Sequence, residues 1–357
     1  MHIETIKLKN FRNYSNQQIE ISPKCNVFYG NNAQGKTNIL EAISVTAIGK
    51  SFRTHKEKEL IKFGEEFSNI EINFIKNNTQ NKIRIDITDK KDIYVNDIKL
   101  KKVSDILGKI NIVLFTPDDI GILKKGPSIR RRFLDMMICG LRPAYVYSLN
   151  QYLKVLEQRN SYLKQAETGR INEELLYIWN EKLATLGNNI YNYRCEFMDK
   201  IKQKINNIHG KITNNKEEIK IKYLSDCENY EAFLEELWTS QSLDFKTGYT
   251  NKGIHRDDFI VYINGKQVSI YGSQGQTRSA ILSLKIAELE IIHEEIGEEP
   301  ILLLDDFMSE LDEQRKKKLL ENIKNNQVII TCTDKIKLEN QTTYKVEQGQ
   351  VYHEAKS

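Results

Sequence analysis

The sequence predicts an α/β protein in which both ends of the chain form one domain and a helical insertion interrupts it. Short apolar strands and helices alternate near both ends, a glycine-rich loop follows an early strand, and strand patterns almost vanish between about residues 127 and 211. A chain of 357 residues is also expected to hold more than one compact core. We therefore predict a domain from residues 1–126 plus 245–357, and a mainly helical arm, or lid, from residues 127–244.

The N-terminal part predicts strand, loop and helix in that order. Residues 2–9 alternate apolar and polar side chains, as a half-buried strand does, and a second strand is expected around residues 19–21. An apolar run at 27–29 stops at Gly30, after which apolar residues recur at helical spacing at Ile39, Leu40, Ile43 and Ala47.

Two further stretches before the arm predict strands. Residues 69–100 alternate in the manner of an antiparallel meander, with a tight turn at Asn96-Asp97. Residues 110–115 read as a buried strand that ends before Pro117. Mixed sheets with flanking helices are therefore expected in the domain formed by the chain ends.

The insertion predicts two long helices joined by a short polar turn at Thr168-Gly169. The second helix would reach about residue 209 and span roughly 55 Å at 1.5 Å per residue, although Gly187 weakens it. An antiparallel hairpin and an ordinary helical bundle both fit this pattern. The apolar positions are Leu149, Leu153, Leu156 and Leu163 in the first helix, and Leu183, Leu186, Ile190, Tyr193, Phe197, Ile201, Ile205 and Ile208 in the second.

The C-terminal part returns to mixed structure. Alternation at 259–263 followed by Asn264-Gly265 predicts a hairpin, and a long helix is expected over 276–296. A buried strand at 301–304, a helix, a strand at 328–330 and a hairpin turned at Gly349 follow.

Residues 30–37 match the phosphate-loop pattern G-x-x-x-x-G-K-[ST] between a predicted strand and a predicted helix. Glycines allow backbone N–H groups to surround phosphate oxygens, and the helix directs its positive end at them. The lysine would reach the β and γ phosphates, and the threonine hydroxyl would bind Mg²⁺. ATP binding is therefore expected at Gly30, Asn31, Asn32, Ala33, Gln34, Gly35, Lys36 and Thr37.

The strand at 301–304 supplies a second half of this site. Asp305 follows its apolar residues, where parallel sheets place ligands, and would hold Mg²⁺ together with Thr37. Asp306 would orient or deprotonate a water molecule near the γ-phosphate. Nearly the whole chain separates the two halves, which favours an ABC-type P-loop ATPase head over a compact kinase.

An ABC-type site needs a further element from a second subunit, a loop and helix N-terminus that face the γ-phosphate. A serine hydroxyl, a glycine that permits close approach and the dipole of the following helix would supply it. The site would then be complete only in an ATP-dependent homodimer. The candidate segment is Ser273, Gln274, Gly275 and Gln276.

Composition limits the other possibilities. The five cysteines are widely spaced, so neither a disulfide framework nor a zinc site is expected. No apolar run is long enough to cross a bilayer and no signal pattern is present, which predicts a cytoplasmic protein without a membrane partner. A net charge of +4 permits nucleic-acid binding without indicating it.

Several motifs in order resemble the RecF family of bacterial recombination-repair ATPases, which is related to SMC heads, and the resemblance covers essentially the full length. They begin with L-K-N-F-R-N-Y at 8–14 and G-K-S-F-R-T at 49–54. The others are F-T-P-D-D at 115–119, R-R-R-F-L-D at 130–135, H-R-D-D at 255–258, S-Q-G-Q at 273–276 and L-D-D at 304–306 with S-E-L-D at 309–312. Proline is usual in the family where this chain has Ile254.

The resemblance implies a DNA-binding protein with weak, DNA-stimulated ATPase activity. It would dimerise with ATP and Mg²⁺ and act at gaps or single-strand/double-strand junctions in repair, replication and the SOS response. The implied partners are RecR and RecO, which help load RecA. It also places Arg12 and Asn13 near the nucleotide, and implies a dimer-coupling loop at Ser309 and Asp312 and a DNA contact at Arg53.

Some roles stay open. Asp306 is shorter than the glutamate common in ABC transporters, so slow turnover is expected. Thr333 or Asp334 would sense the γ-phosphate, and Asp118 or Asp119 would replace a glutamine-loop. DNA phosphates or acidic residues within the fold are both possible partners for Arg130, Arg131 and Arg132, which cannot all point one way on a helix.

Three other functions fit the sequence less well. A nucleotide-binding subunit of a membrane transporter is disfavoured by the arm, by the missing switch histidine and by the absence of a clear glutamine-loop. A metabolite kinase would not need Ser273 or a distant second half-site. A structural protein with a vestigial site is disfavoured by the intact Lys36, Thr37 and Asp305.

Overall fold

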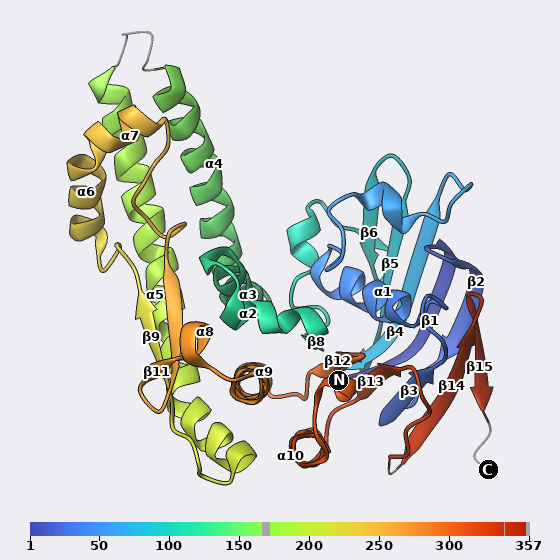
Figure 1. Cartoon of the computed structure of the whole chain (residues 1–357). Coiled ribbons are helices and arrows are strands. Elements are labelled where there is room, and N and C mark those ends of the chain that lie inside the picture. Colours follow the sequence, from blue (N-terminus) through green and yellow to red (C-terminus); the bar gives the residue numbers. More distant parts are fainter. Residues whose placement is uncertain (166–171, 339, 355–357) are drawn as a thin grey trace. The chain divides into compact units, whose positions relative to one another are not determined.

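The structure is a computed structural model of the chain and describes residues 1–165, 172–338 and 340–354. It consists of two compact units (Figure 1). The first comprises residues 1–119 and 282–357, and the second residues 120–281. Residues 245–281, which were expected in the ATPase head, lie in the second unit in this division. The reason is strand pairing and polar contacts that hold this segment to the helices of that unit.

The first unit contains an antiparallel sheet with strand order β2-β1-β4-β5-β6-β7. The predicted strand and meander are confirmed, including the turn at Asn96 and Asp97, whose φ angles of 50° and 65° suit a tight hairpin. Buried isoleucines alternate along its central strands. The bounds are β1 His2–Phe11, β2 Tyr14–Glu20, β4 Ser68–Lys76, β5 Thr79–Ile87, β6 Lys91–Val95 and β7 Ile98–Lys99.

A mixed sheet, ordered β15-β14-β3-β13-β12-β8, forms the rest of the first unit. Its strands pair in parallel from β14 to β8, and β15 is antiparallel to β14. Strands β12 and β13 are buried at every residue, as expected of central parallel strands. The bounds are β3 Cys25–Tyr29, β8 Ile112–Phe115, β12 Ile301–Asp305, β13 Val328–Cys332, β14 Gln341–Glu347 and β15 Gln350–Glu354.

Helix α1 (Lys36–Ile48) packs against strands of both sheets, and their side chains form one core. Burial therefore extends around the helix and includes Ser44 and Thr46, which periodicity did not single out. The buried side chain of Gln327 bonds the backbone of Ile3 in β1, through Oε1 at 2.7 Å and Nε2 at 2.7 Å. The other helices are α10 (Glu313–Asn322) and the 3₁₀ turns η1 (Glu57–Leu60), η2 (Val103–Ile106), η3 (Pro117–Asp119) and η5 (Phe307–Glu310).

The second unit is mainly helical. Helices α4 (Pro143–Gln165) and α5 (Glu173–Thr213) lie side by side and run antiparallel (Figure 1), and α3 and α6 also pack on α5. The predicted pair of long helices is therefore part of a small bundle; its predicted turn lies outside the described residues. The buried face of α4 differs from the predicted one, because Leu153 is half exposed and Tyr145, Tyr152 and Arg159 are buried instead.

Gly187 is explained by packing against helix α6, which periodicity did not predict. A Cβ atom at Gly187 would lie 2.5 Å from the Phe233 ring, so only glycine allows α6 to approach α5. The remaining elements are α2 Ile120–Lys124, α3 Pro127–Cys139, β9 Ile219–Leu224, α6 Tyr230–Thr239, α7 Gln241–Thr247, β10 Asp258–Ile263, β11 Lys266–Gln267 and α8 Val268–Tyr271. Helix α9 (Gln274–Ile296) begins in the second unit, and its residues from 282 belong to the first.

Buried arginines join distant segments of the second unit. Arg194 donates to Asp135 at 2.8 Å, to Asp257 at 2.8 Å and to the Ile254 carbonyl at 2.7 Å. A buried charge of this kind is tolerated because every segment around it supplies an acceptor. The motifs at 130–135 and 255–258 are thus held together through α5.

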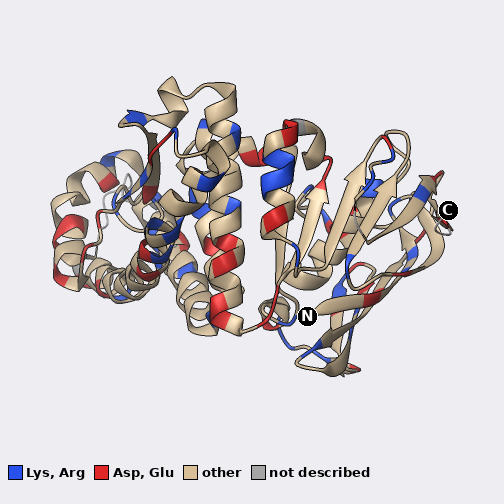
Figure 2. Ribbon diagram, turned by 90° about the horizontal axis from the view of Figure 1, so that it is seen from below, with Lys and Arg blue, Asp and Glu red and all other residues tan. Residues whose placement is uncertain are grey.

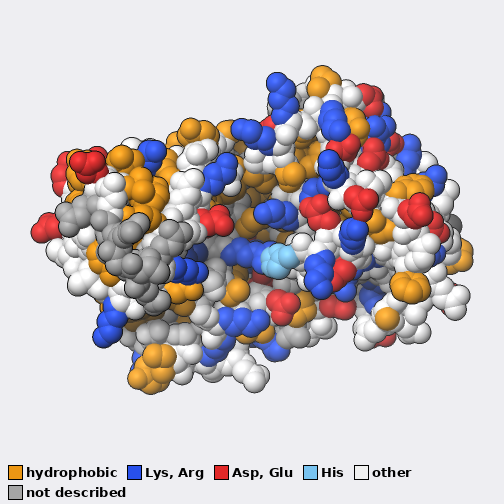
Figure 3. All heavy atoms as spheres, turned by 90° about the horizontal axis from the view of Figure 1, so that it is seen from above, with side chains coloured by type: hydrophobic (Ala, Val, Ile, Leu, Met, Phe, Trp, Pro, Cys, Tyr) orange, Lys and Arg blue, Asp and Glu red, His pale blue; other side chains and the backbone are white. Residues whose placement is uncertain are grey.

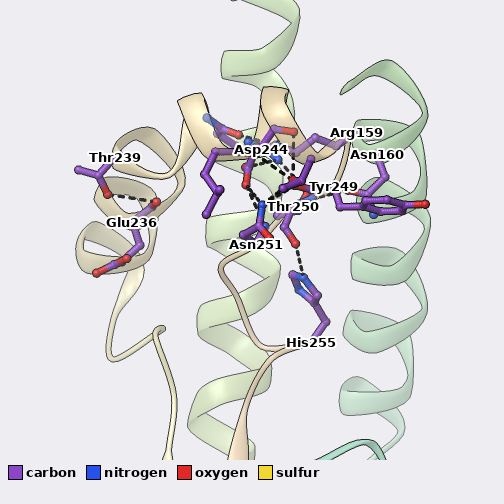
Figure 4. A network of polar contacts seen from close by, with 12 residues as sticks. Arg159, Asn160, Glu236, Thr239, Asp244, Tyr249, Thr250, Asn251 and His255 are labelled. Atoms are coloured by element: carbon purple, nitrogen blue, oxygen red, sulfur yellow. Dashed lines mark hydrogen bonds and ion pairs between the residues drawn. The ribbon is translucent and has the colours of Figure 1, made fainter. Parts of the chain in front are cut away.

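A second network joins α4 to α7 and to the loop that follows α7 (Figure 4). Arg159 and Asp244 are both fully buried and form an ion pair of 2.8 Å, and Arg159 also donates to Thr250 at 2.7 Å. The other carboxylate oxygen of Asp244 accepts from the N–H and the amide of Asn251, each at 2.9 Å. This network fixes α7 and the following loop against α4.

Replacing Asp244 by asparagine should destabilise the protein by about 3–5 kcal/mol, because Arg159 would be left as an uncompensated buried charge. Urea unfolding followed by circular dichroism measures the change. The matched control is Asp226→Asn, whose partner Lys252 is 3.3 Å away at the surface, and it should change stability by no more than about 1 kcal/mol. Equal effects of the two substitutions would contradict the assignment.

Candidate nucleotide site

The phosphate-loop sequence forms a tight turn between β3 and α1. Gly30 and Gly35 have φ angles of 151° and 116°, which side chains rarely adopt. Space is also restricted, since a Cβ at Gly30 would lie 2.3 Å from the Val346 carbonyl oxygen, and one at Gly35 would lie 2.6 Å from the Asn13 amide. Both glycines of the motif are therefore required by conformation and by packing.

Lys36 and Thr37 occupy the first turn of α1 and point to the same region. The Lys36 ammonium donates to the carbonyls of Gly30 at 2.6 Å and Asn31 at 2.9 Å, which holds it within the curve of the loop. The Thr37 hydroxyl donates to Asp305 at 2.8 Å, across 268 positions of sequence. The two predicted halves of the site are adjacent in the structure.

Thr331 of strand β13 contacts Asp305, the last residue of β12, and the backbone of Asp306, which follows it. Thr331 donates to the same Asp305 oxygen at 2.8 Å, and its hydroxyl accepts from the Asp306 N–H at 3.0 Å. Asp306 has a left-handed backbone with φ of 48°. Burial raises the pKa of Asp306, Lys36 opposes that rise, and Asp305 adds to it.

Three contacts that the sequence did not reveal support the loop from outside the motif. The Tyr14 hydroxyl donates to the Gly35 carbonyl at 3.0 Å. The turn between β14 and β15 supplies the others, since the Gln348 N–H donates to the Gln34 side chain at 2.6 Å and the Gly349 N–H to the Gln34 carbonyl at 3.2 Å. The two backbone donors of this turn belong to no motif, so only the fold identifies them.

Asn13 contacts the loop directly, whereas Arg12 is bound to an acidic side chain. Asn13 donates to the Gln34 carbonyl at 2.8 Å and accepts from Asn38 at 2.8 Å. Arg12 makes a bidentate ion pair with the fully buried Glu41, at 2.6 and 2.9 Å. Arg53, the expected DNA contact, also reaches Glu41, at 3.3 Å. Glu41 therefore positions both arginines beside the loop.

A surface pocket of about 1200 Å³ opens on this side of the loop. The ring of Phe63 in its wall is fully exposed to solvent, although it lies among polar and charged side chains. Other residues in its wall include Arg12, Asn13, Asn38, Lys62 and Phe67.

A second pocket of the first unit brings together four of the other candidates. Asp306, Ser309, Thr333 and Asp334 all line it. The Ser309 hydroxyl donates to the Asp306 carbonyl at 2.6 Å. Asp312, the other expected coupling residue, caps α10 by accepting from the Arg315 N–H at 2.9 Å.

The glutamine-loop candidates Asp118 and Asp119 form η3, after β8. Asp119 accepts from the Thr116 N–H at 2.8 Å, and burial raises the pKa of its carboxyl. The side chain of Lys285, in α9, lies near enough to oppose that rise.

The predicted trans segment begins α9 and belongs to the second unit. The Ser273 hydroxyl accepts from the Gln276 N–H, and the Gln276 side chain accepts from the Ser273 N–H, both at 3.1 Å. This reciprocal pair is a capping box. The hydroxyl proton of Ser273 remains available for a further acceptor, and Gln274 and Gly275 form the first turn of the helix.

Two of the three consecutive arginines of α3 are bonded within the second unit. Arg130 pairs with Asp258 at 2.5 and 2.9 Å and also reaches the Lys125 carbonyl at 2.7 Å. Arg131 donates to the Asp257 carbonyl at 2.8 Å. Arg132 is exposed. A solvent-facing position for a DNA phosphate therefore exists at Arg132, whereas Arg130 serves the fold.

Charge does not single out one face of either unit. Lys and Arg are interspersed with Asp and Glu along the described parts of both (Figure 2), and the surface drawn in Figure 3 has the same mixture. None of the described helices is long and apolar enough to cross a membrane.

Comparison with known proteins gives a consistent result. Residues 2–354 match the RecF/RecN/SMC N terminal domain family. A protein of Acetivibrio thermocellus named DNA replication and repair protein RecF is 42% identical over 369 residues, covering 99% of this chain and 100% of that protein. Its namesake in Clostridium tetani is 44% identical over 365 residues, covering 98% of this chain and 99% of that protein.

Solved structures agree with these relatives. One described as the recombination mediator protein RecF-ATP in the RecFOR pathway has a TM-score of 0.92 and 40% identity, and covers 99% of this chain and 98% of that chain. An Smc head domain from Pyrococcus furiosus, at 17% identity, has a TM-score of 0.59 over 99% of this chain and 96% of that chain, which shows likeness in fold. The predicted fold class, an ABC-type head with an inserted helical arm, is confirmed.

Proposed function

This chain belongs to the RecF family of DNA replication and repair proteins, and we propose that it is an ATP-dependent DNA-binding protein of recombinational repair. ATP binding is shared with a relative of 40% identity. The observation that carries the proposal is the contact between Thr37 and Asp305, beside the ammonium of Lys36. An anion site at a helix N-terminus next to a metal-binding pair of oxygens is the arrangement that a nucleoside triphosphate requires.

The oxygens at this point suit Mg²⁺. Thr37 offers a hydroxyl and Asp305 a carboxylate, and hard oxygen ligands are those that Mg²⁺ prefers. When bound, the ion would neutralise charge on the phosphates. Thr331 holds Asp305 in the orientation that this contact needs.

The residues that line the two pockets suggest the direction of the nucleotide. We place the γ-phosphate beside Asp306 and Thr333, where Asp306 would accept a proton from water and Thr333 or Asp334 would contact the phosphate. The nucleoside half would then extend toward Asn13 and Asn38, into the pocket that contains Phe63. An exposed aromatic ring offers a face on which a base can stack.

A second copy of the chain would complete the γ-phosphate side. We assign this role to Ser273, whose hydroxyl proton is available and whose loop precedes the 23-residue helix α9. Hydrolysis would then open the dimer and act as a switch, with Ser309 and Asp312 near the interface.

The DNA-related roles rest on family membership. We propose binding to gapped or junction DNA, with weak ATPase activity that DNA stimulates, and cooperation with RecR and RecO in loading RecA, with roles in replication and the SOS response. Arg53 and the exposed Arg132 are the candidate phosphate contacts, and Arg131 is less accessible.

ATP·Mg²⁺ should convert the protein from monomer to dimer, and short gapped DNA should bind the dimer more tightly. Light scattering measures the first step and fluorescence anisotropy the second.

Ser273→Asp retains an N-cap acceptor but places a negative charge against the γ-phosphate, so ATP should still bind without dimerisation. Ser273→Thr is the matched control. Wild-type dimerisation by the Asp variant would refute the trans role.

Asp306→Asn should dimerise with ATP but hydrolyse it at least about 100-fold more slowly, because the general base is lost. In the wild-type protein, the rate should decline as the pH is lowered toward the raised pKa of Asp306, since the carboxylate must be unprotonated to accept a proton. Phosphate release across pH measures both effects. Hydrolysis at hundreds per second in the wild type would contradict the switch.

Phe63→Ala should weaken ATP binding about tenfold by removing a stacking surface, while Phe63→Tyr should retain affinity. Binding of inorganic triphosphate should be unaffected by either change. Calorimetry with both ligands makes the comparison, and equal losses of ATP and triphosphate affinity would show that the effect is not on the nucleoside.

A further inference from the structure

The capping box of α9 is held from outside by an acidic residue. While Oε1 of Gln276 accepts from the Ser273 N–H at 3.1 Å, its Nε2 donates to Glu217 at 2.9 Å. Both ends of the Gln276 amide are thereby assigned, and the side chain has one orientation. Ser273 and Glu217 are thus connected through a single side chain.

Glu217 lies between the end of α5, at Thr213, and the start of β9, at Ile219. Its other carboxylate oxygen lies 3.3 Å from Nε2 of His209, which is fully buried in the last turns of α5. The Glu217 side chain itself is only 20% exposed, so its hydrogen bonds are partly shielded from water. A continuous polar path therefore leads from the long helix to Ser273.

Other contacts hold the same loop from a second side. The Lys124 ammonium donates to the carbonyls of Val268 and Gly272, each at 3.2 Å, and Gly272 directly precedes Ser273. The Thr277 hydroxyl donates to the Ser273 carbonyl at 2.9 Å. The backbone around Ser273 is fixed before any partner arrives, and Glu217 is the part of this support that reaches α5.

We infer that Glu217 is a positioning residue for the trans half of the ATP site, through which the end of α5 controls the placement of Ser273. The inference rests on the proposed function. A hydroxyl that must meet a phosphate in another subunit needs its position fixed to a fraction of an ångström. Displacement of the end of α5 would move Glu217, release the Gln276 amide and disorder the Ser273 N–H contact. The arm thereby affects dimer closure without touching the nucleotide.

The test compares three variants of the full chain. Glu217→Ala should weaken ATP-dependent dimerisation about tenfold, the size of one hydrogen bond to a charged group, while the affinity of the monomer for ATP stays unchanged. Glu217→Gln retains an acceptor for Gln276 and should restore dimerisation to within about threefold. The control is Glu218→Ala, which removes an exposed carboxylate that pairs with Lys220 and should behave as wild type.

The readouts separate this role from a general effect on folding. If Glu217→Ala lowers ATP affinity and dimerisation together with the unfolding midpoint, and Glu217→Gln does not restore them, Glu217 is structural and the inference is wrong. In the double variant Glu217→Ala with Gln276→Ala, the loss should not exceed that of Gln276→Ala alone; additive losses would also overturn it. Absence of ATP-dependent dimers in the wild type would instead refute the proposed function.

Discussion

The contact between Thr37 and Asp305 depends on the order of strands in the mixed sheet. β3 leads into the phosphate loop, β12 ends in Asp305, and β13 lies between them with parallel pairing on both sides. Because parallel strands end at the same edge, residues 268 positions apart meet there, and Thr331 of the middle strand bonds the carboxylate. The site therefore exists only after the C-terminal strands have joined the N-terminal one. Even the last hairpin participates, since its turn holds Gln34.

The motifs in the second unit have a different physical role. In the sequence, the arginine-rich motif at 130–135 and the motif at 255–258 look like ligand contacts. In the structure, Arg130, Asp257 and Asp258 form ion pairs within the unit. Arg194 completes the set from α5 and is almost fully buried. Removing one member of such a set leaves a desolvated charge, which is more costly than losing a surface pair. These residues occur together in the sequence because each needs the others as a polar partner within the fold.

Sequence patterns predicted what is local or strongly periodic: the phosphate loop, the meander, the long helices and the hairpin turns with positive φ. They did not predict α7, or α6, whose packing on α5 depends on Gly187. They also did not predict the buried face of α4, where Tyr152 and Arg159 are buried and Leu153 is not. A periodic pattern of apolar residues places arginine on the exposed face of a helix. Arg159 is buried because its tertiary partner Asp244 is buried with it. In the site, Glu41 was missed for the same reason, because a buried carboxylate is recognised only by the two arginines that approach it.

Ser273 illustrates how one residue can serve both a helix and an interface. Its hydroxyl oxygen accepts from the Gln276 N–H, which fixes the start of α9, while its proton is not required by that bond. Dimer closure would then add an acceptor to a hydroxyl that is already oriented, instead of ordering a loose loop at the cost of conformational entropy. For the same reason, the position of the Ser273 hydroxyl depends on the hydrogen bonds that hold the loop. Gln276 bonds the Ser273 N–H and Glu217 bonds Gln276, so a displacement of Glu217 would reach Ser273 through one side chain.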